Sequence, residues 1–185
     1  MADEEIEEPD LPLLALQTLA EGMRGLTPTA GAYLAEAAAV CLEDQGHPIR
    51  CILIVTGSFD ARFHLDRQSI DEQDRATHWD TDRATENGAC GVGILVVSQL
   101  TRLEVLRQSR KGKGFDYHLV PRGTFLFRNR TRLEVTGIRN DGMAEIQRRV
   151  AVRKARFEHF GDQGIPDALI VVIEFSRPVA HVVRL

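Results

Sequence analysis

The feature that most constrains this chain is an uninterrupted apolar run near its C-terminus, DALIVVIEF at residues 167–175. A run of this kind is typical of a strand that is buried on both faces of a sheet. A second run, IRCILIVTGSF at residues 49–59, lies between Pro48 and Gly57 and predicts another buried strand. Both runs indicate that the fold is organised around a central sheet.

Helical and strand-like segments are distributed around these two runs. The patterns predict helices at 10–25, at 27–47 with Thr27 as N-cap, from about 80 to 100, and at 141–161 with Asp141 as cap. Further strands are predicted at 101–109, 114–120, 131–138 and 179–185. Residues 66–80 are polar and are predicted to be irregular.

This order predicts an α/β (α+β) fold in which helices flank a mixed central sheet. The N-terminal helices form an extension that covers one face of the sheet. Residues 1–9 are acidic and are expected to be disordered, and residues 10–185 form one domain. Glycines 88, 91 and 93 suit a helix only if it lies very close to the sheet.

The composition favours a cytoplasmic protein. No segment is apolar enough to suggest a membrane span, and the acidic N-terminus does not resemble a secretory signal. Cys41, Cys51 and Cys90 are odd in number and lack zinc-site spacing, so we expect them to be buried thiols. The sequence leaves self-association into a homo-oligomer open.

Charge is divided unevenly along the chain. Residues 1–100 contain 6 basic and 18 acidic residues, whereas residues 101–160 contain 15 basic and 6 acidic residues. The basic block either faces a polyanion such as nucleic acid or pairs with the acidic half of the chain. The residues predicted to contact nucleic acid are Arg110, Lys111, Arg130, Arg149 and Arg153.

Two acidic residues occupy positions within predicted strands. Alternation in GFDYHLV places Asp116 and His118 on the face opposite Tyr117, and in RLEVTGI it places Glu134 and Thr136 opposite Val135. Carboxylates on neighbouring strands repel each other unless a cation or a proton lies between them. Mg²⁺ is commonly held by one or two carboxylates, with waters and phosphate oxygens.

This arrangement resembles the PD-(D/E)XK nuclease-like, or restriction-endonuclease-like, superfamily across about residues 81–175. The resemblance implies that Glu86 is the helix glutamate and that Asp116 and Glu134 bind Mg²⁺ or Mn²⁺ for phosphodiester hydrolysis. The chain departs from the family at the motif lysine, where it has Thr136. Lys113, in the glycine-flanked segment RKGKG, or Lys154, on the following helix, is the predicted substitute, with Lys111 less favoured.

Two functions remain open at this point. The chain is a metal-dependent phosphodiester hydrolase acting on nucleic acid, or it keeps a nuclease-like fold without catalysis and binds nucleic acid or another protein. The carboxylates also admit purely structural roles: Asp116 can cap a turn, Glu134 can pair with an arginine, and Glu86 can lie in a solvated helical turn.

Overall fold

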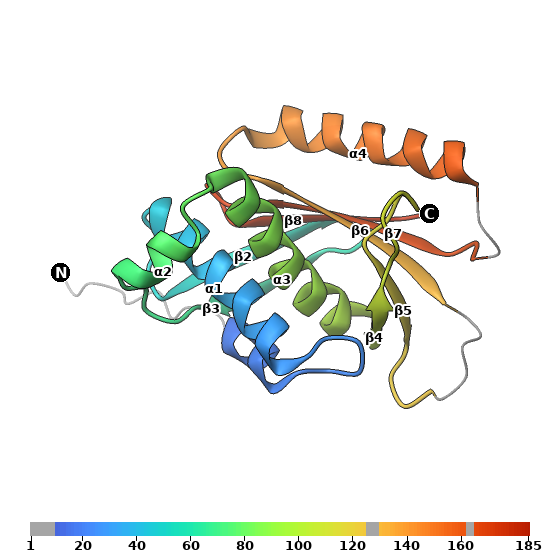
Figure 1. Ribbon diagram of the computed structural model, residues 1–185. Helices are drawn as coiled ribbons and strands as arrows, with labels where there is room; N and C mark the ends of the chain where they lie inside the picture. The colour runs from blue at the N-terminus through green and yellow to red at the C-terminus, as the bar shows by residue number, and fades with distance from the viewer. Residues whose placement is uncertain (1–9, 125–129, 162–164) are drawn as a thin grey trace.

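The computed structural model, shown in Figure 1, describes residues 10–124, 130–161 and 165–185. The expected disorder of residues 1–9 lies outside the described residues. Eight strands form one mixed sheet in the order β1-β3-β2-β8-β7-β6-β5-β4. The strands are β1 (Leu13–Ala15), β2 (Arg50–Gly57), β3 (Ala61–Asp66), β4 (Leu103–Gln108), β5 (Tyr117–Pro121), β6 (Thr131–Ile138), β7 (Ala168–Glu174) and β8 (Val179–Arg184).

The apolar run at 167–175 forms the central strand β7, and every residue of that strand is buried. Leu169 and Val171 belong to the core on one face, and Ile170 and Val172 belong to the core on the other. β7 runs parallel to β6 and antiparallel to β8. The prediction of a strand buried on both faces is confirmed.

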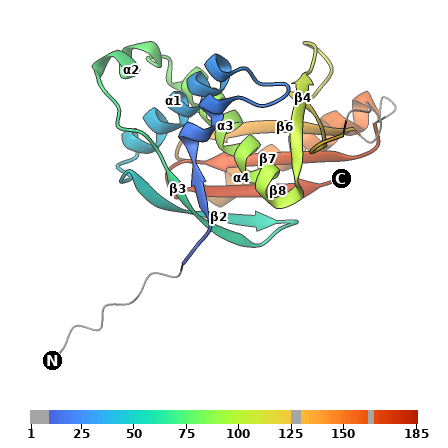
Figure 2. The same ribbon diagram turned by 90° about the horizontal axis from the view of Figure 1, so that it is seen from below.

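Helices cover both faces of the sheet, which gives the predicted mixed α/β architecture. α1 (Pro28–Asp44) and α3 (Thr81–Thr101) pack against the larger core on one face, and α4 (Gly142–Phe160) packs against the smaller core on the other. Seen from below in Figure 2, α1 and α3 lie in front of the sheet, with α4 behind it. Within the described part of the chain, no helix is long and apolar enough to cross a membrane.

Local signals place the helix ends. The Thr27 side chain accepts a hydrogen bond from the backbone N–H of Ala30, and Asp80 does the same for the first turn of α3. Gly161 ends α4 with φ 64°, as predicted. Asp141 precedes α4 but makes no side-chain capping bond.

Two segments differ from their sequence-based prediction. The expected helix at 10–25 is instead strand β1 followed by a 3₁₀ helix, Leu16–Glu21. Residues 13–15 form an edge strand because the backbone of β1 pairs in parallel with that of β3. The polar region 66–80 contains a short helix, α2 (Glu72–Thr77), which begins at a capping box formed by Asp71 and Asp74. Strand β3 was not predicted.

The glycines of α3 do permit close packing, but only one of them faces the sheet. A Cβ at Gly93 would lie 3.1 Å from a side-chain atom of Val135 on β6. At Gly88 and Gly91 the nearest atoms belong to the backbone of α1, at 2.8 and 3.0 Å. The expectation of a close helix–sheet contact is therefore corrected to a close contact of α3 with both β6 and α1.

Candidate functional site

The candidate site lies where β5 and β6 separate. The two strands pair only over Tyr117–Leu119 and Thr131–Leu133. Beyond this ladder the Asp116 N–H still donates to the Leu133 carbonyl oxygen, at 2.9 Å. The next backbone N–H groups on this edge of β6, at Val135 and Gly137, have no strand partner among the described residues. We call this separation of β5 and β6 the fork. Unpaired N–H groups in a protein interior are costly, so the fork requires hydrogen-bond acceptors from elsewhere in the chain.

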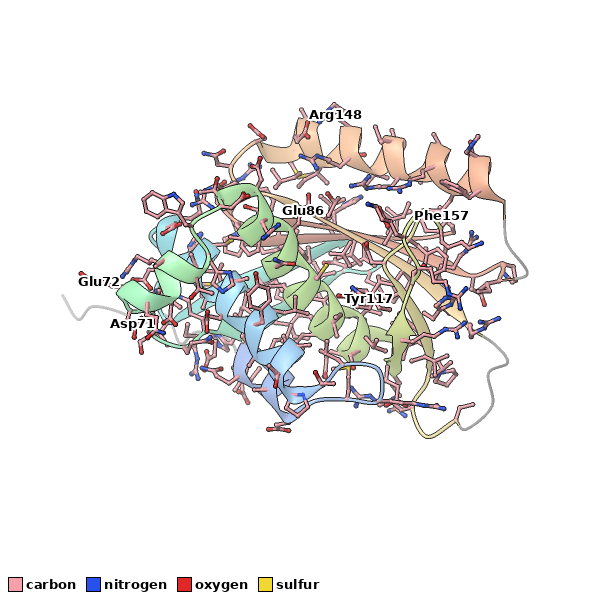
Figure 3. All side chains as sticks on the ribbon, viewed as in Figure 1. Asp71, Glu72, Glu86, Tyr117, Arg148 and Phe157 are labelled. Atoms are coloured by element: carbon pink, nitrogen blue, oxygen red, sulfur yellow. The ribbon has the colours of Figure 1, made fainter. Side chains whose placement is uncertain are left out.

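Two of the predicted site carboxylates supply those acceptors. Asp116 Oδ2 accepts from the Val135 N–H at 2.8 Å, and Glu86 Oε2 accepts from the Gly137 N–H at 3.3 Å. Two residues along a strand span about 7 Å, so both carboxylates lie at one locus. The locus joins α3 to the sheet, and Figure 3 shows Glu86 on the side of α3 nearer to α4.

Asp116 and Glu134 form a buried carboxyl pair. Their side chains are hydrogen-bonded to each other, and the Glu134 side chain is only 5% exposed. Burial, followed by the charge of Asp116, raises the pKa of Glu134 to about 8. Burial also raises the pKa of Asp116. Burial and the mutual repulsion of the two carboxylates therefore favour a proton shared between them.

Arginines of α4 surround the position where the family has its lysine. Arg149 Nη1 and Arg153 Nη2 donate to Thr136 Oγ1 at 3.1 and 3.4 Å. Arg153 Nε also lies 3.0 Å from Glu134 Oε1, and Arg156 Nη1 lies 3.6 Å from the same oxygen. Positive charge is thus present at the site, and guanidinium groups supply it.

Glu86 shares this cluster. Its Oε1 accepts from the Thr136 hydroxyl at 3.3 Å and lies 3.6 Å from Arg149 Nη1. Its side chain remains 47% exposed, so the ion pair with Arg149 is accessible to solvent. Glu86 belongs to the second turn of α3, and its contacts differ from those of a solvated first-turn glutamate.

Of the three candidate lysines, the less favoured Lys111 lines the cavity of the carboxyl pair, and Lys113 and Lys154 do not. Lys111 lines a cavity of about 420 Å³ together with Asp116, Glu134 and Arg156. Lys113 instead lines a neighbouring pocket of about 280 Å³ with His118 and Arg130. Lys154 lies near His181 on β8, where its charge helps to lower the pKa of that histidine.

The loop that carries two of the lysines has the backbone that its glycines favour. Gly112 and Gly114 adopt φ of 85° and 82°. A Cβ at Gly114 would lie 2.5 Å from the Phe160 ring, so the loop packs against the end of α4. The loop therefore forms one wall of the cavity above the carboxyl pair.

The residues predicted to contact nucleic acid fall into two groups. Arg110 and Lys111 line the cavity above the carboxyl pair, and Arg130 lines the neighbouring pocket. Arg149 and Arg153 are turned into the site and bind Thr136 and the acidic side chains. The basic block is therefore partly a solvent-facing surface and partly the internal counter-charge of the carboxylates.

The pair Asp116 and Glu134 has donor chemistry that suits a hard divalent cation, since Mg²⁺ takes one or two protein carboxylates. Ligands of one Mg²⁺ lie within about 4 Å of each other, because each metal–oxygen bond is about 2.1 Å. Glu86 is bound to the Gly137 N–H, two residues along β6 from the Val135 N–H that holds Asp116. Among the described residues, no group of three or more His, Cys, Asp or Glu side chains is arranged to hold a metal.

The sequence predicted the acidic residues of the site, but it predicted Arg149 and Arg153 as nucleic-acid contacts and did not single out Arg156, whereas the structure makes all three counter-charges of the acidic residues. Arg149, Arg153 and Arg156 follow one another on α4 at intervals of four and three residues, which places them on one helix face. That spacing was the available signal for a basic stripe facing Glu134. No protein-family model, curated protein or solved structure matches this chain.

Proposed function

We propose that this protein is an atypical member of the PD-(D/E)XK nuclease-like superfamily that hydrolyses phosphodiester bonds of nucleic acid with the help of Mg²⁺ or Mn²⁺. The observation that carries the proposal is the buried pair of Asp116 and Glu134, held in contact at the floor of a cavity with basic walls. Like charges brought together in this way need a cation or a proton between them.

Each group has a role that follows from its position. Asp116 is held by the Val135 N–H, so the carboxylate is oriented before any ligand arrives. Glu134 loses its shared proton when a cation binds, because only the ionised carboxylate is a good ligand. A bound divalent cation would supply Lewis-acid polarisation of the phosphate and activation of a water molecule.

The basic groups around the pair would bind the substrate phosphates and offset their negative charge. Arg110 and Lys111 line the cavity and can pair with phosphate oxygens of the strand. Arg153 and Arg156 lie beside Glu134, where their fixed positive charge can offset charge that develops during the reaction. Thr136 positions Arg149 and Arg153 through its hydroxyl.

A second candidate function, nucleic-acid binding without hydrolysis, is favoured by one specific observation. Glu134 already faces two guanidinium groups, which relieve part of the repulsion that a metal would otherwise relieve. In this interpretation the carboxyl pair keeps its proton and the cavity binds phosphate through Arg110 and Lys111 alone.

Metal titration separates the two functions. Calorimetry with Mn²⁺ is run at pH 6.5 and pH 8.5, because metal must displace the Glu134 proton and binding should tighten as pH rises toward 8. The matched variants are Asp116→Asn and Glu134→Gln. The control is Glu72→Gln, at an exposed position of α2 far from the site (Figure 3).

Cleavage of single- and double-stranded DNA and RNA is then followed with Mg²⁺ and Mn²⁺. The proposal expects heat of binding and cleavage in the wild type and in Glu72→Gln, and neither in the two site variants. Absence of cleavage and metal heat in the wild type, combined with salt-sensitive binding of a nucleic-acid strand, would establish the second function instead.

A further inference from the structure

A second pocket adjoins the cavity above the carboxyl pair and is lined by basic groups. It has a volume of about 280 Å³, and its charged lining comprises Arg107, Arg110, Lys113 and Arg130. Among the described residues that line it, none is acidic. An anion inside the pocket would meet guanidinium groups from more than one segment of the chain, which favours its binding.

His118 forms part of this pocket. Its ring packs edge-on against Phe115, with centroids 4.8 Å apart and planes at 86°. Its Nδ1 atom is buried and has no hydrogen-bond partner among the described residues. Burial and the charges of Arg107 and Arg130 lower the pKa of His118 to about 4, so the ring is neutral near pH 7 and can donate one N–H.

The two cavities share part of their lining. Gln108, Arg110 and Phe115 line both of them. β5 and β6 also link the two, because His118 is paired with Arg132 and lies two residues beyond Asp116 along the chain. A strand of nucleic acid crossing the first cavity would therefore bring its neighbouring phosphate to the second.

We propose that the pocket of Arg107, Arg110, Lys113 and Arg130 binds an internal phosphate of a nucleic-acid strand, next to the phosphate held above Asp116 and Glu134. Guanidinium groups suit this ligand because their N–H donors match two phosphate oxygens at once. The inference rests on the proposed function in one respect only, because the phosphate in this pocket would belong to the same nucleic-acid strand as the phosphate above the carboxyl pair.

Fluorescence anisotropy in EDTA tests the pocket without any metal chemistry. The probe is a single strand of about 12 nucleotides, labelled at its 3′ end and prepared with and without a 5′-phosphate. The variant is Arg107→Gln/Arg130→Gln. Its control, Arg62→Gln/Arg83→Gln, makes the same charge change at two exposed positions of β3 and α3.

The pocket variant is expected to bind about five-fold more weakly at 0.1 M salt for each phosphate that it no longer neutralises, with a slope of log K against log salt shallower by about 0.7. The control should keep the wild-type slope. Arg107→Gln alone, at an exposed position, should give a smaller loss of affinity of the same sign. The effect should persist in an Asp116→Asn/Glu134→Gln background, because this binding does not need the carboxyl pair.

An equal slope in the wild type and the pocket variant would overturn the inference, as would a wild type that binds no DNA or RNA strand. Dependence on the 5′-phosphate would overturn the internal position of the phosphate and indicate a phosphomonoester site. Failure of metal-dependent cleavage, measured separately, would contradict the proposed hydrolysis but leave this pocket standing.

Discussion

The shared proton between Asp116 and Glu134 makes stability depend on pH in a calculable way. The pKa of Glu134 is about 8 in the folded chain, against an ordinary value of 4.5. Because the folded-state pKa is the higher one, protonation favours folding: this contribution is complete below about pH 4.5 and is lost as pH rises through 8. A difference of this size corresponds to about 5 kcal/mol at most.

The perturbation is Glu134→Gln, because the amide can donate to Asp116 as the protonated acid does and cannot ionise. Between pH 5 and 7 the wild type should lose about 1.4 kcal/mol of unfolding free energy per pH unit relative to the variant. At pH 9 the variant should be more stable by about 3 to 5 kcal/mol.

Urea unfolding, followed by circular dichroism at unit steps from pH 5 to pH 9, measures both chains. Taking the difference between them cancels the titrating groups that do not interact with Glu134, so the difference reports the pair of Asp116 and Glu134. If the unfolding free energies of the two chains differ by the same amount at every pH in this range, the shared proton is refuted. The assignment of the raised pKa to Glu134 is then refuted as well.

Two further substitutions probe the packing that supports the site. Thr136→Lys, which introduces the lysine that the resembled superfamily has at this position, should destabilise the chain by about 3 to 5 kcal/mol in urea unfolding and give no gain in cleavage. The reason is that Thr136 is fully buried and bonded to Arg149 and Arg153, so an ammonium group would meet two like charges; unchanged stability with faster cleavage would contradict this. Gly31→Ala should cost about 1 to 3 kcal/mol in thermal melting, because the added Cβ would lie 1.8 Å from the Leu19 carbonyl oxygen. An unchanged melting temperature would show that α1 can shift away from the 3₁₀ helix.

The parts of the fold that sequence could predict are those set by local pattern. The apolar run of β7, the caps at Thr27 and Gly161, and the alternation in β5 and β6 each follow from neighbours in the chain. β1 could not be predicted in this way, because its three residues become a strand only by pairing with β3.

The same division holds at the candidate site. Alternation placed Asp116 and Glu134 on one face, and the structure brings them into contact. The counter-charges from α4 depend on how that helix crosses the sheet, which no local pattern specifies. Arg149 and Arg153 were therefore predicted as nucleic-acid contacts, although both bond to Thr136 within the site.

The fork between β5 and β6 has a consequence for how such a protein can change over time. Asp116 and Glu86 each hold a backbone N–H of β6 that no strand reaches. A chain with this fork and no hydrolytic activity would still need both acids as acceptors for these N–H groups, so the requirement to fold is enough to preserve them. Acidic side chains at such a fork therefore do not by themselves distinguish a hydrolase from a binding protein.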